Sequence, residues 1–207
     1  MDAPADQNDT RFLDDFIMLE TLDVDLYRAT ELWNSYSDRT FGGHLVAQAL
    51  QSAICTVSEG FCLHICHNLF VRPARTNIPI VYHVSRIRDG ENFCARTVSV
   101  MQNGKIISTV QASFYKQDMQ VCVPIMFQSV MPVTEHYSNL SATTTLQPGY
   151  TLPGSLPIEI RPVNPDVYTH HVVGKTHKLL SWIRVCGRIG GFQFIKLRYR
   201  FSYQRLF

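Results

Sequence analysis

One segment of the sequence, residues 39–53, constrains the fold more than any other. It reads RTFGGHLVAQALQSA and contains no acidic residue. Its polar side chains beyond the double glycine are few: His44, Gln48, Gln51 and Ser52. Apolar residues recur at helical spacing through this region, whereas a surface helix normally carries charge on its outer face. The sequence therefore predicts a helix over 43–57 that is enclosed by other structure.

Segments with strand character lie on both sides of this helix. Residues 16–33 mix helix and strand signals, and the alternation of Leu22, Val24 and Leu26 with acidic residues favours a strand. Four more strands are predicted, at 62–71, 79–87, 93–102 and 105–115. Asn103-Gly104 joins the last two, because both central residues of a type I′ hairpin turn need a positive φ. This order predicts an α+β domain with one helix against a curved antiparallel sheet.

The remaining sequence divides into three parts. A length of 207 residues suits one domain, or one domain with part of another. After a first domain at 1–117, residues 118–155 have few charges and several prolines, which is typical of a linker. Apolar segments return at 156–190, and a basic, aromatic tail follows at 191–207.

Charge is divided unevenly along the chain. Residues 1–166 hold 11 Lys or Arg and all 17 Asp or Glu, whereas residues 167–207 hold 8 Lys or Arg and no acid. A tail of this kind could bind nucleic acid through cations on phosphates and rings stacked on bases. The residues concerned are Lys196, Arg198, Arg200 and Arg205 for phosphates, and Phe194, Tyr199 and Phe201 for bases. No recognised nucleic-acid module precedes them, so we expect neither a nucleic-acid partner nor a membrane-surface role.

Three features bear on the cellular compartment. The N-terminus, MDAPADQNDTRFLDDF, is acidic and lacks the apolar core of a signal peptide. The uncharged run at 41–58 is too rich in polar side chains for a membrane span. We therefore expect an intracellular protein whose six cysteines are reduced.

Several motifs in a fixed order resemble the acyl-CoA thioesterase II family, which includes a bacterial medium-chain enzyme and an animal peroxisomal enzyme. They are RTFGGHLVAQAL, LHICHNLFVRPA and PIVYHVSRIRDGENFCARTVSVMQNGKIISTVQASF, and the match resumes at LPIEIRPVNP and LSWIRVCGRIG. The resemblance implies a double hotdog fold, in which each half is a long helix wrapped by an antiparallel sheet. The helix at 43–57 would be the central helix of the first hotdog, and 156–190 the start of an incomplete second one.

The resemblance also implies a function, the hydrolysis of fatty acyl-CoA to free fatty acid and CoA without a cofactor. It implies substrate contacts by Phe41, Gly42, Gly43 and His64, with the glycines bringing backbone N–H groups near the ligand. The glycines could equally serve only a tight turn into the helix, and His64 could be a hydrogen-bonded strand histidine. His44 stands where the family commonly has Gln, which leaves it without an assigned role.

In this family the catalytic Asp, Ser or Thr, and Gln lie in the second hotdog, beyond the motif that reads GRIG here. This chain has no acidic residue after Asp166. We therefore assign no catalytic residue and expect the chain to be catalytically impaired.

The tail suggests a reason for the missing acid. Codons permitted for FQFIKLRYRFSYQRLF, shifted by one base, can read SNSLNYAIAFLTSDY, which resembles the family strand that carries the Asp. Our hypothesis is that residues 191–207 are translated in a shifted reading frame. The chain ends in RLF and not in a peroxisomal tripeptide of the S-K-L type, so a peroxisomal matrix location rests on resemblance alone.

Two alternatives concern binding. A non-catalytic acyl-CoA-binding or dimerising hotdog subunit fits the same motifs, and an exposed sheet edge would favour self-association. The run CLHICH looks like a metal site. On a regular strand, however, Cys62, His64 and Cys66 share one face and His67 takes the other, so we assign no metal.

Other enzymatic readings are weaker. A cysteine nucleophile could be Cys55, in the predicted helix, or Cys94, whose pKa Arg96 could lower from two residues away. No histidine that would pair with either is identifiable. The motif GRIGG lacks the spacing of a dinucleotide-binding loop, and the family motifs argue against an enoyl-CoA hydratase.

Overall fold

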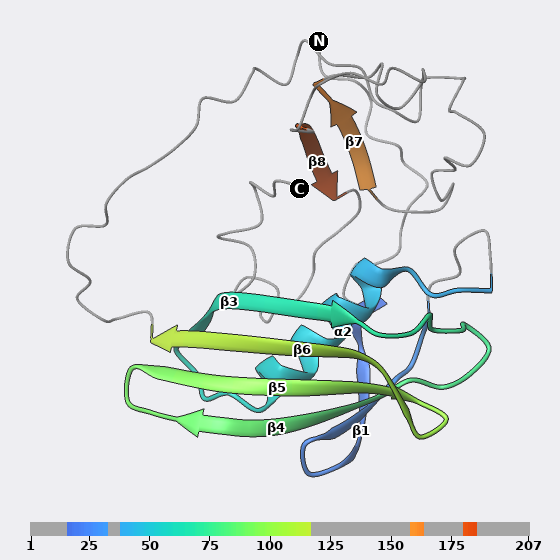
Figure 1. The fold of residues 1–207 in the computed structure, drawn as a ribbon. Helices are drawn as coiled ribbons and strands as arrows, with labels where there is room; N and C mark the ends of the chain where they lie inside the picture. The colour runs from blue at the N-terminus through green and yellow to red at the C-terminus, as the bar shows by residue number, and fades with distance from the viewer. Residues whose placement is uncertain (1–15, 33–37, 117–157, 164–179, 186–207) are drawn as a thin grey trace. The chain divides into compact units, whose positions relative to one another are not determined.

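The structure is a computed structural model of the 207-residue chain, and it describes residues 16–32, 38–116, 158–163 and 180–185. In this part of the chain, six strands form one antiparallel sheet in the order β1-β2-β4-β5-β6-β3, and helix α2 lies against one of its faces (Figure 1). The elements are β1 Leu19–Asp23, β2 Leu26–Ala29, α2 Gly42–Cys55, β3 Phe61–Phe70, β4 Val81–Asp89, β5 Phe93–Gln102 and β6 Lys105–Lys116. The predicted linker at 118–155 and tail at 191–207 lie outside the described residues.

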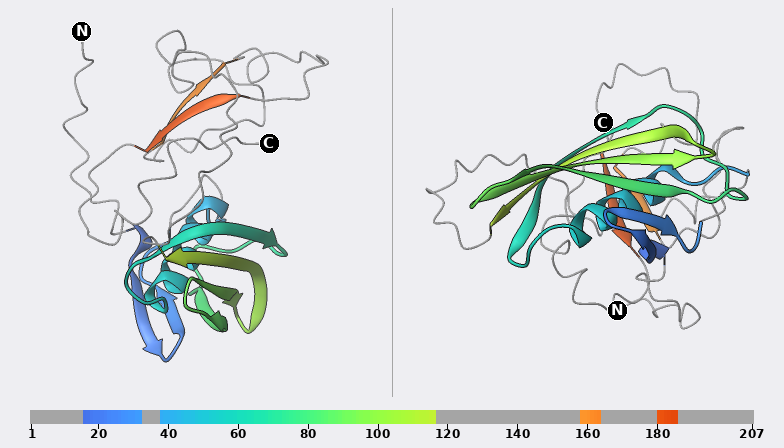
Figure 2. Two further views of the ribbon diagram at one scale, coloured as in Figure 1. Left: turned by 90° about the vertical axis from the view of Figure 1, so that its left-hand side faces the viewer. Right: turned by 90° about the horizontal axis from the view of Figure 1, so that it is seen from below.

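The long strands curve around the helix, as two further views show (Figure 2). Strands β5 and β6 pair antiparallel from Phe93–Tyr115 to Gln102–Lys105. The turn between them, Asn103-Gly104, has φ values of 49° and 70°, which confirms the predicted hairpin. From Cys94 to Gln102 along β5, buried and half-buried residues alternate, so one face of the sheet belongs to the core.

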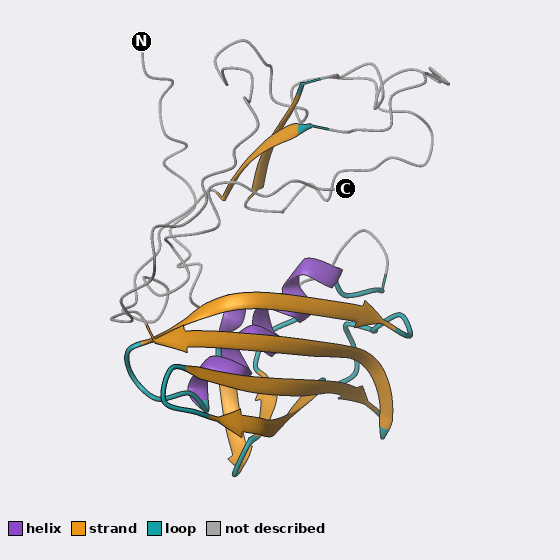
Figure 3. Ribbon diagram, turned by 60° about the vertical axis from the view of Figure 1, so that its left-hand side comes forward, coloured by secondary structure: helices purple, strands orange, loops and turns teal. Residues whose placement is uncertain are grey.

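Helix α2 is enclosed, as its lack of charge predicts. Its apolar residues Leu45, Ala49, Leu50 and Ala53 belong to the hydrophobic core. The four polar side chains singled out in the sequence are buried as well. Small alanines allow the sheet to approach closely, and the coloured ribbon shows the helix held within the curve of the strands (Figure 3). The helix begins one residue earlier and ends two residues earlier than predicted.

The prediction of one strand through Leu22, Val24 and Leu26 is wrong. The chain turns back at Val24 and Asp25, so two short strands form a hairpin in its place. Asp25 has a φ of 56°, a left-handed conformation that aspartate tolerates. Val24 is 79% exposed at the tip of the turn. The alternating apolar residues therefore belong to two strands of a hairpin, because the turn at Val24-Asp25 interrupts the single strand that their pattern predicts.

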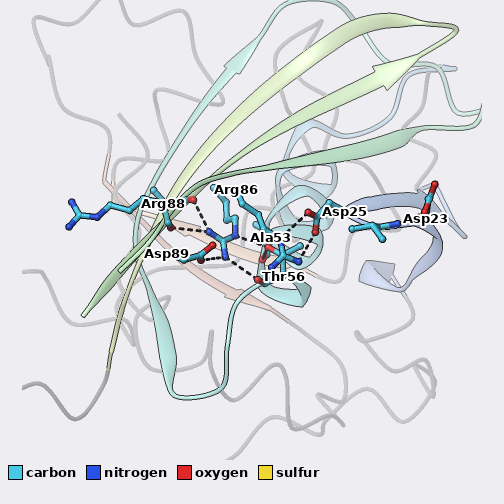
Figure 4. A network of polar contacts seen from close by, with 10 residues as sticks. Asp23, Asp25, Ala53, Thr56, Arg86, Arg88 and Asp89 are labelled. Atoms are coloured by element: carbon cyan, nitrogen blue, oxygen red, sulfur yellow. Dashed lines mark hydrogen bonds and ion pairs between the residues drawn. The ribbon is translucent and has the colours of Figure 1, made fainter. Parts of the chain in front are cut away.

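A buried arginine, Arg96, fixes the C-terminal end of α2, and Figure 4 shows the polar network in which its partners Thr56, Arg88 and Asp89 are labelled. Arg96, 2% exposed, donates from Nε to Thr56 Oγ1 at 2.8 Å and from Nη2 to the Thr56 backbone oxygen at 3.0 Å. Its guanidinium also binds the Asp89 carboxylate and the backbone oxygens of Arg88 and Ala95. Thr56 is the residue that ends the helix, so these bonds tie the helix terminus to strands β4 and β5.

A second, two-stranded sheet is described separately. Strands β7, Ile158–Pro162, and β8, Ser181–Val185, pair antiparallel with Ile160 opposite Ile183. Just beyond the strands, the Val163 amide donates to the Leu180 oxygen at 2.8 Å. These strands coincide with the two later sequence motifs, LPIEIRPVNP and LSWIRVCGRIG.

Candidate functional site

The N-terminal end of α2 presents backbone amides without a side-chain cap. Phe41 occupies the N-cap position, and no side chain hydrogen-bonds there. The first amides that bond to the Phe41 oxygen are those of His44 and Leu45, at 3.1 and 3.3 Å. The amides of Gly42 and Gly43 therefore precede the first helical bond. A helix end of this kind favours an anion or a carbonyl oxygen that is gaining negative charge.

Two phenylalanine rings explain why both residues of the pair are glycine. A Cβ on Gly42 would lie 2.9 Å from Cζ of Phe70, and a Cβ on Gly43 would lie 2.5 Å from Cε1 of Phe41. Neither glycine has a positive φ, since Gly60 and Gly104 are the described glycines that do. The pair therefore needs no left-handed backbone, and the absence of a Cβ lets two rings lie against the helix end; whether the pair serves a ligand or only the turn stays a prediction.

Phe70 is the site residue that sequence reasoning missed. It ends strand β3 and is 54% exposed, although its ring contacts the start of the helix. The only signal in the sequence was an aromatic residue at the end of a strand, directly before Val-Arg-Pro. The two rings form an apolar border around the exposed amide end of the helix.

The segment before the helix is held by backbone bonds to the loop after β3. The amide of Thr40 donates to the Ala74 oxygen at 3.0 Å, and that of Thr76 donates to the Asp38 oxygen at 2.9 Å. The buried Thr40 hydroxyl has no hydrogen-bond partner within the described ranges. Such a group is available to a ligand or a water molecule.

The structure does not bring His64 to this end of the helix. His64 lies six residues before Phe70 on β3, which is about 20 Å of extended chain. The register of β3 against β6 slips between Leu63 and Ile65, so His64 is the extra residue of a bulge. Its ring centroid lies 5.8 Å from that of Phe93 and 6.0 Å from that of Tyr115.

The bulge also corrects the prediction that Cys62, His64 and Cys66 share one face. Cys62 pairs with Tyr115, whereas Cys66 pairs with Ala112 and packs against the core. One extra residue reverses the alternation, so the two cysteines lie on opposite faces. Across the described residues, no group of three His, Cys, Asp or Glu is placed to hold a metal ion.

The cysteine-nucleophile alternative loses its physical basis. Burial raises the pKa of the Cys94 thiol, and the nearby Arg96 charge offsets only part of this. Burial likewise raises the pKa of Cys55. A thiol with a raised pKa is a poor nucleophile at neutral pH. The four cysteines in the described part of the chain, Cys55, Cys62, Cys66 and Cys94, are free thiols.

A buried polar network fixes the helix beneath the site. Gln48 is fully buried, and its side-chain nitrogen donates to the oxygens of Phe16 and Glu31, at 3.1 and 3.0 Å. The buried Tyr82 hydroxyl donates to Gln48 Oε1 at 2.6 Å. His44 Nε2 also bonds the Phe16 oxygen, and burial lowers the His44 pKa. One glutamine thereby joins both ends of the β1–β2 hairpin to α2.

Comparison with known proteins identifies this domain. Residues 29–115 match the family model described as the acyl-CoA thioesterase N-terminal domain. They belong to the acyl-CoA thioesterase family. This region includes the β4–β5–β6 meander, the helix and its two-ring border. The match confirms the family that the sequence motifs indicate.

Relatives and solved structures agree with this assignment. The chain is 37% identical to mouse acyl-coenzyme A thioesterase 8 over 188 residues, which is 83% of this chain and 58% of that protein. It is 37% identical to yeast peroxisomal acyl-coenzyme A thioester hydrolase 1 over 81 residues, or 39% of this chain and 23% of that protein. The chain thus spans less than two thirds of the length of these relatives.

The fold prediction is confirmed by similar solved structures. An acyl-CoA thioesterase II from Mycobacterium marinum has 28% identity and a TM-score of 0.61, covering 83% of this chain and 59% of its own. A protein with a hotdog fold from Alicyclobacillus acidocaldarius has 17% identity and a TM-score of 0.58, covering 83% of this chain and 61% of its own. In the described ranges, no helix of the thioesterase domain or beyond it is long and apolar enough to cross a membrane.

Proposed function

We propose that this chain binds fatty acyl-CoA and belongs to an enzyme that hydrolyses it to free fatty acid and CoA. The observation that carries the proposal is the uncapped end of α2, bordered by Phe41 and Phe70, within a domain of the acyl-CoA thioesterase family. Backbone amides there can polarise a thioester carbonyl, and the rings offer an apolar surface to the acyl chain. The names of the mouse and yeast relatives support the same substrate class.

Substrate contact is assigned to Phe41, Gly42 and Gly43. His64, predicted as a further contact, lies about 20 Å of strand away on β3 and would reach only a different part of the ligand. Thioester hydrolysis also needs a base to activate water, and the described acid in the segment before the helix, Asp38, is exposed and paired with Arg75. The proposal therefore includes weak turnover by these 207 residues themselves, with no metal or cofactor required.

Two measurements on the purified chain test this proposal. Calorimetric titration with medium- and long-chain acyl-CoA should show binding, and a thiol reagent should detect little release of CoA. Turnover of about 1–10³ per second would contradict the catalytic impairment, while absence of binding would contradict the substrate assignment. Binding without turnover would support the second candidate as well, a non-catalytic acyl-CoA-binding subunit.

Self-association is part of the proposal, because β3 has a free edge in the described sheet. It pairs with β6 on one side, and no described strand pairs with its other side. Ile65 and Leu69 on this strand are 45% and 63% exposed. An exposed, apolar edge strand promotes pairing with another chain. Light scattering at micromolar concentration should show dimers or larger species, whereas a stable monomer would contradict this part.

The proposed location is the peroxisome, supported by the name of the yeast relative. A fluorescent fusion of the chain should coincide with a peroxisomal marker. A diffuse signal would contradict the location and leave the substrate assignment untouched.

A further inference from the structure

One buried side chain, that of Gln102, holds the loop between β3 and β4. Gln102 ends strand β5 and is 8% exposed. Its Nε2 donates to the backbone oxygens of Arg75 and Ile78, at 2.7 and 2.8 Å, and its Oε1 accepts from the Arg75 amide at 3.0 Å. A single amide group therefore satisfies both backbone groups of Arg75 and a third group of the loop, in the way a neighbouring strand would.

The same loop holds the segment that leads into helix α2. Residues 38–40 lie antiparallel to residues 74–76 around the bridge between Arg39 and Arg75. Two backbone bonds, of 3.0 and 2.9 Å, join the two segments on either side of this bridge. Residue 40 is followed directly by Phe41, the N-cap of the helix. Gln102 is therefore linked to the start of α2 through one layer of backbone.

The start of α2 and the end of β3 are already in close contact. A Cβ on Gly42 would lie 2.9 Å from the Phe70 ring, so the two sides of the site have little room to shift. Phe70 is placed by its pairing with Ser108 on β6, and Gln102 pairs with Lys105 at the start of the same strand. The β5–β6 hairpin thus places one side of the site through β3 and the other side through the loop.

Resting on the proposed function, we infer that Gln102 is a positioning residue for thioester binding. It holds the amides of Gly42 and Gly43 at a fixed distance from the Phe70 ring, and it does so through the backbone of residues 74–76. A ligand that lies between amides and a ring loses affinity when the two sides move apart. Methionine has a similar length but cannot donate to the loop oxygens, so Gln102→Met releases the loop while filling the space.

Calorimetric titration of the full chain with an acyl-CoA and with free CoA tests this role. Gln102→Met should bind acyl-CoA about tenfold more weakly, whereas affinity for free CoA, which has no thioester carbonyl, should change by less than about twofold. Thr76→Pro removes the amide that donates to the Asp38 oxygen and leaves Gln102 in place, so it should show the same difference. The control is Arg96→Met, which weakens the opposite end of α2 and should change neither affinity.

Hydrogen exchange followed by mass spectrometry gives a readout that needs no ligand. In Gln102→Met, the amides of residues 38–45 should exchange about tenfold faster, and those of residues 49–55 should keep their wild-type rates. Arg96→Met should accelerate exchange in residues 49–55 instead. Equal acceleration along the whole helix in Gln102→Met would indicate a general loss of stability and would overturn the positioning role.

The outcomes separate this inference from the proposed function. Unchanged acyl-CoA binding by Gln102→Met, or equal weakening of acyl-CoA and free CoA, overturns the inference and leaves the proposed function standing. A wild-type chain that binds no acyl-CoA overturns both, because Gln102 then has no thioester to position. Circular dichroism shows whether the variants fold, and Thr76→Pro carries the same test if Gln102→Met does not.

Discussion

Arg96→Met should be among the most damaging single changes in the first sheet. The arginine is almost fully buried, and its bonds hold the Thr56 hydroxyl and carbonyl at the end of α2. Methionine has a similar volume and no donor. Arg86 provides a matched control, because it lies directly opposite Arg96 in the β4–β5 pair but is exposed, where it binds Asp25 through two bonds of 2.9 Å.

The expected magnitudes follow from burial. In Arg96→Met, the two Thr56 oxygens lose their guanidinium partner, and a buried acceptor without a partner costs about 1–3 kcal/mol. The cost applies to each of the two oxygens, and removal of an unfavourable buried charge offsets part of the total. We therefore expect the free energy of unfolding to fall by about 3 kcal/mol. Arg86→Met loses an ion pair that is half-exposed on the arginine side, which costs at most about 1 kcal/mol.

Urea unfolding followed by far-ultraviolet circular dichroism measures both variants against the wild-type chain. A loss of about 3 kcal/mol corresponds to a fall in Tm of roughly 6–12 °C for a chain of this size. Arg96→Lys should recover part of the loss because it restores a single donor. If Arg86→Met destabilised the chain as much as Arg96→Met, the argument that burial of the guanidinium decides the cost would fail.

Three further changes test the helix and its site. Gly42→Ala should weaken acyl-CoA binding and lower the free energy of unfolding by about 1 kcal/mol, because its Cβ meets the Phe70 ring. Adding Phe70→Leu should restore binding in a calorimetric titration, and no recovery would contradict the ring contact. Burial lowers the His44 pKa below 6.5, so the folded chain binds fewer protons than the unfolded chain, and stability should fall as the pH drops below about 6.5. Urea unfolding at several pH values should show that His44→Gln flattens this dependence. Gln48→Leu should lower the free energy of unfolding by about 2–3 kcal/mol, because it leaves the Tyr82 hydroxyl buried without a partner. The double variant with Tyr82→Phe should lose less stability than the sum of the two single losses, and strict additivity would show that the two groups are not coupled.

Much of the fold could be predicted because local pattern and burial agree in these segments. The helix lacks charge along its whole length, so it can be stable only inside other structure. Strand β5 alternates between buried and half-buried residues, and an Asn-Gly turn joins it to β6, which sets the register of the pair within a residue or two. The family motifs follow the same elements, and the comparison with known proteins confirms the family for residues 29–115.

Only the tertiary structure decided the hairpin, the bulge and the ring contacts. A turn at Val24-Asp25 and a single extra residue at His64 each reverse which face a side chain takes, and neither disturbs the apolar pattern enough to be predicted. The glycine pair is explained by Phe70, which is 28 residues away from Gly42 in the sequence and lies against it only after β3 has paired with β6. The sequence by itself therefore determined which segments are helix and strand, because periodicity is a local property. The composition of the site was decided by long-range packing, because contacts between distant residues depend on strand register and on close approach of side chains.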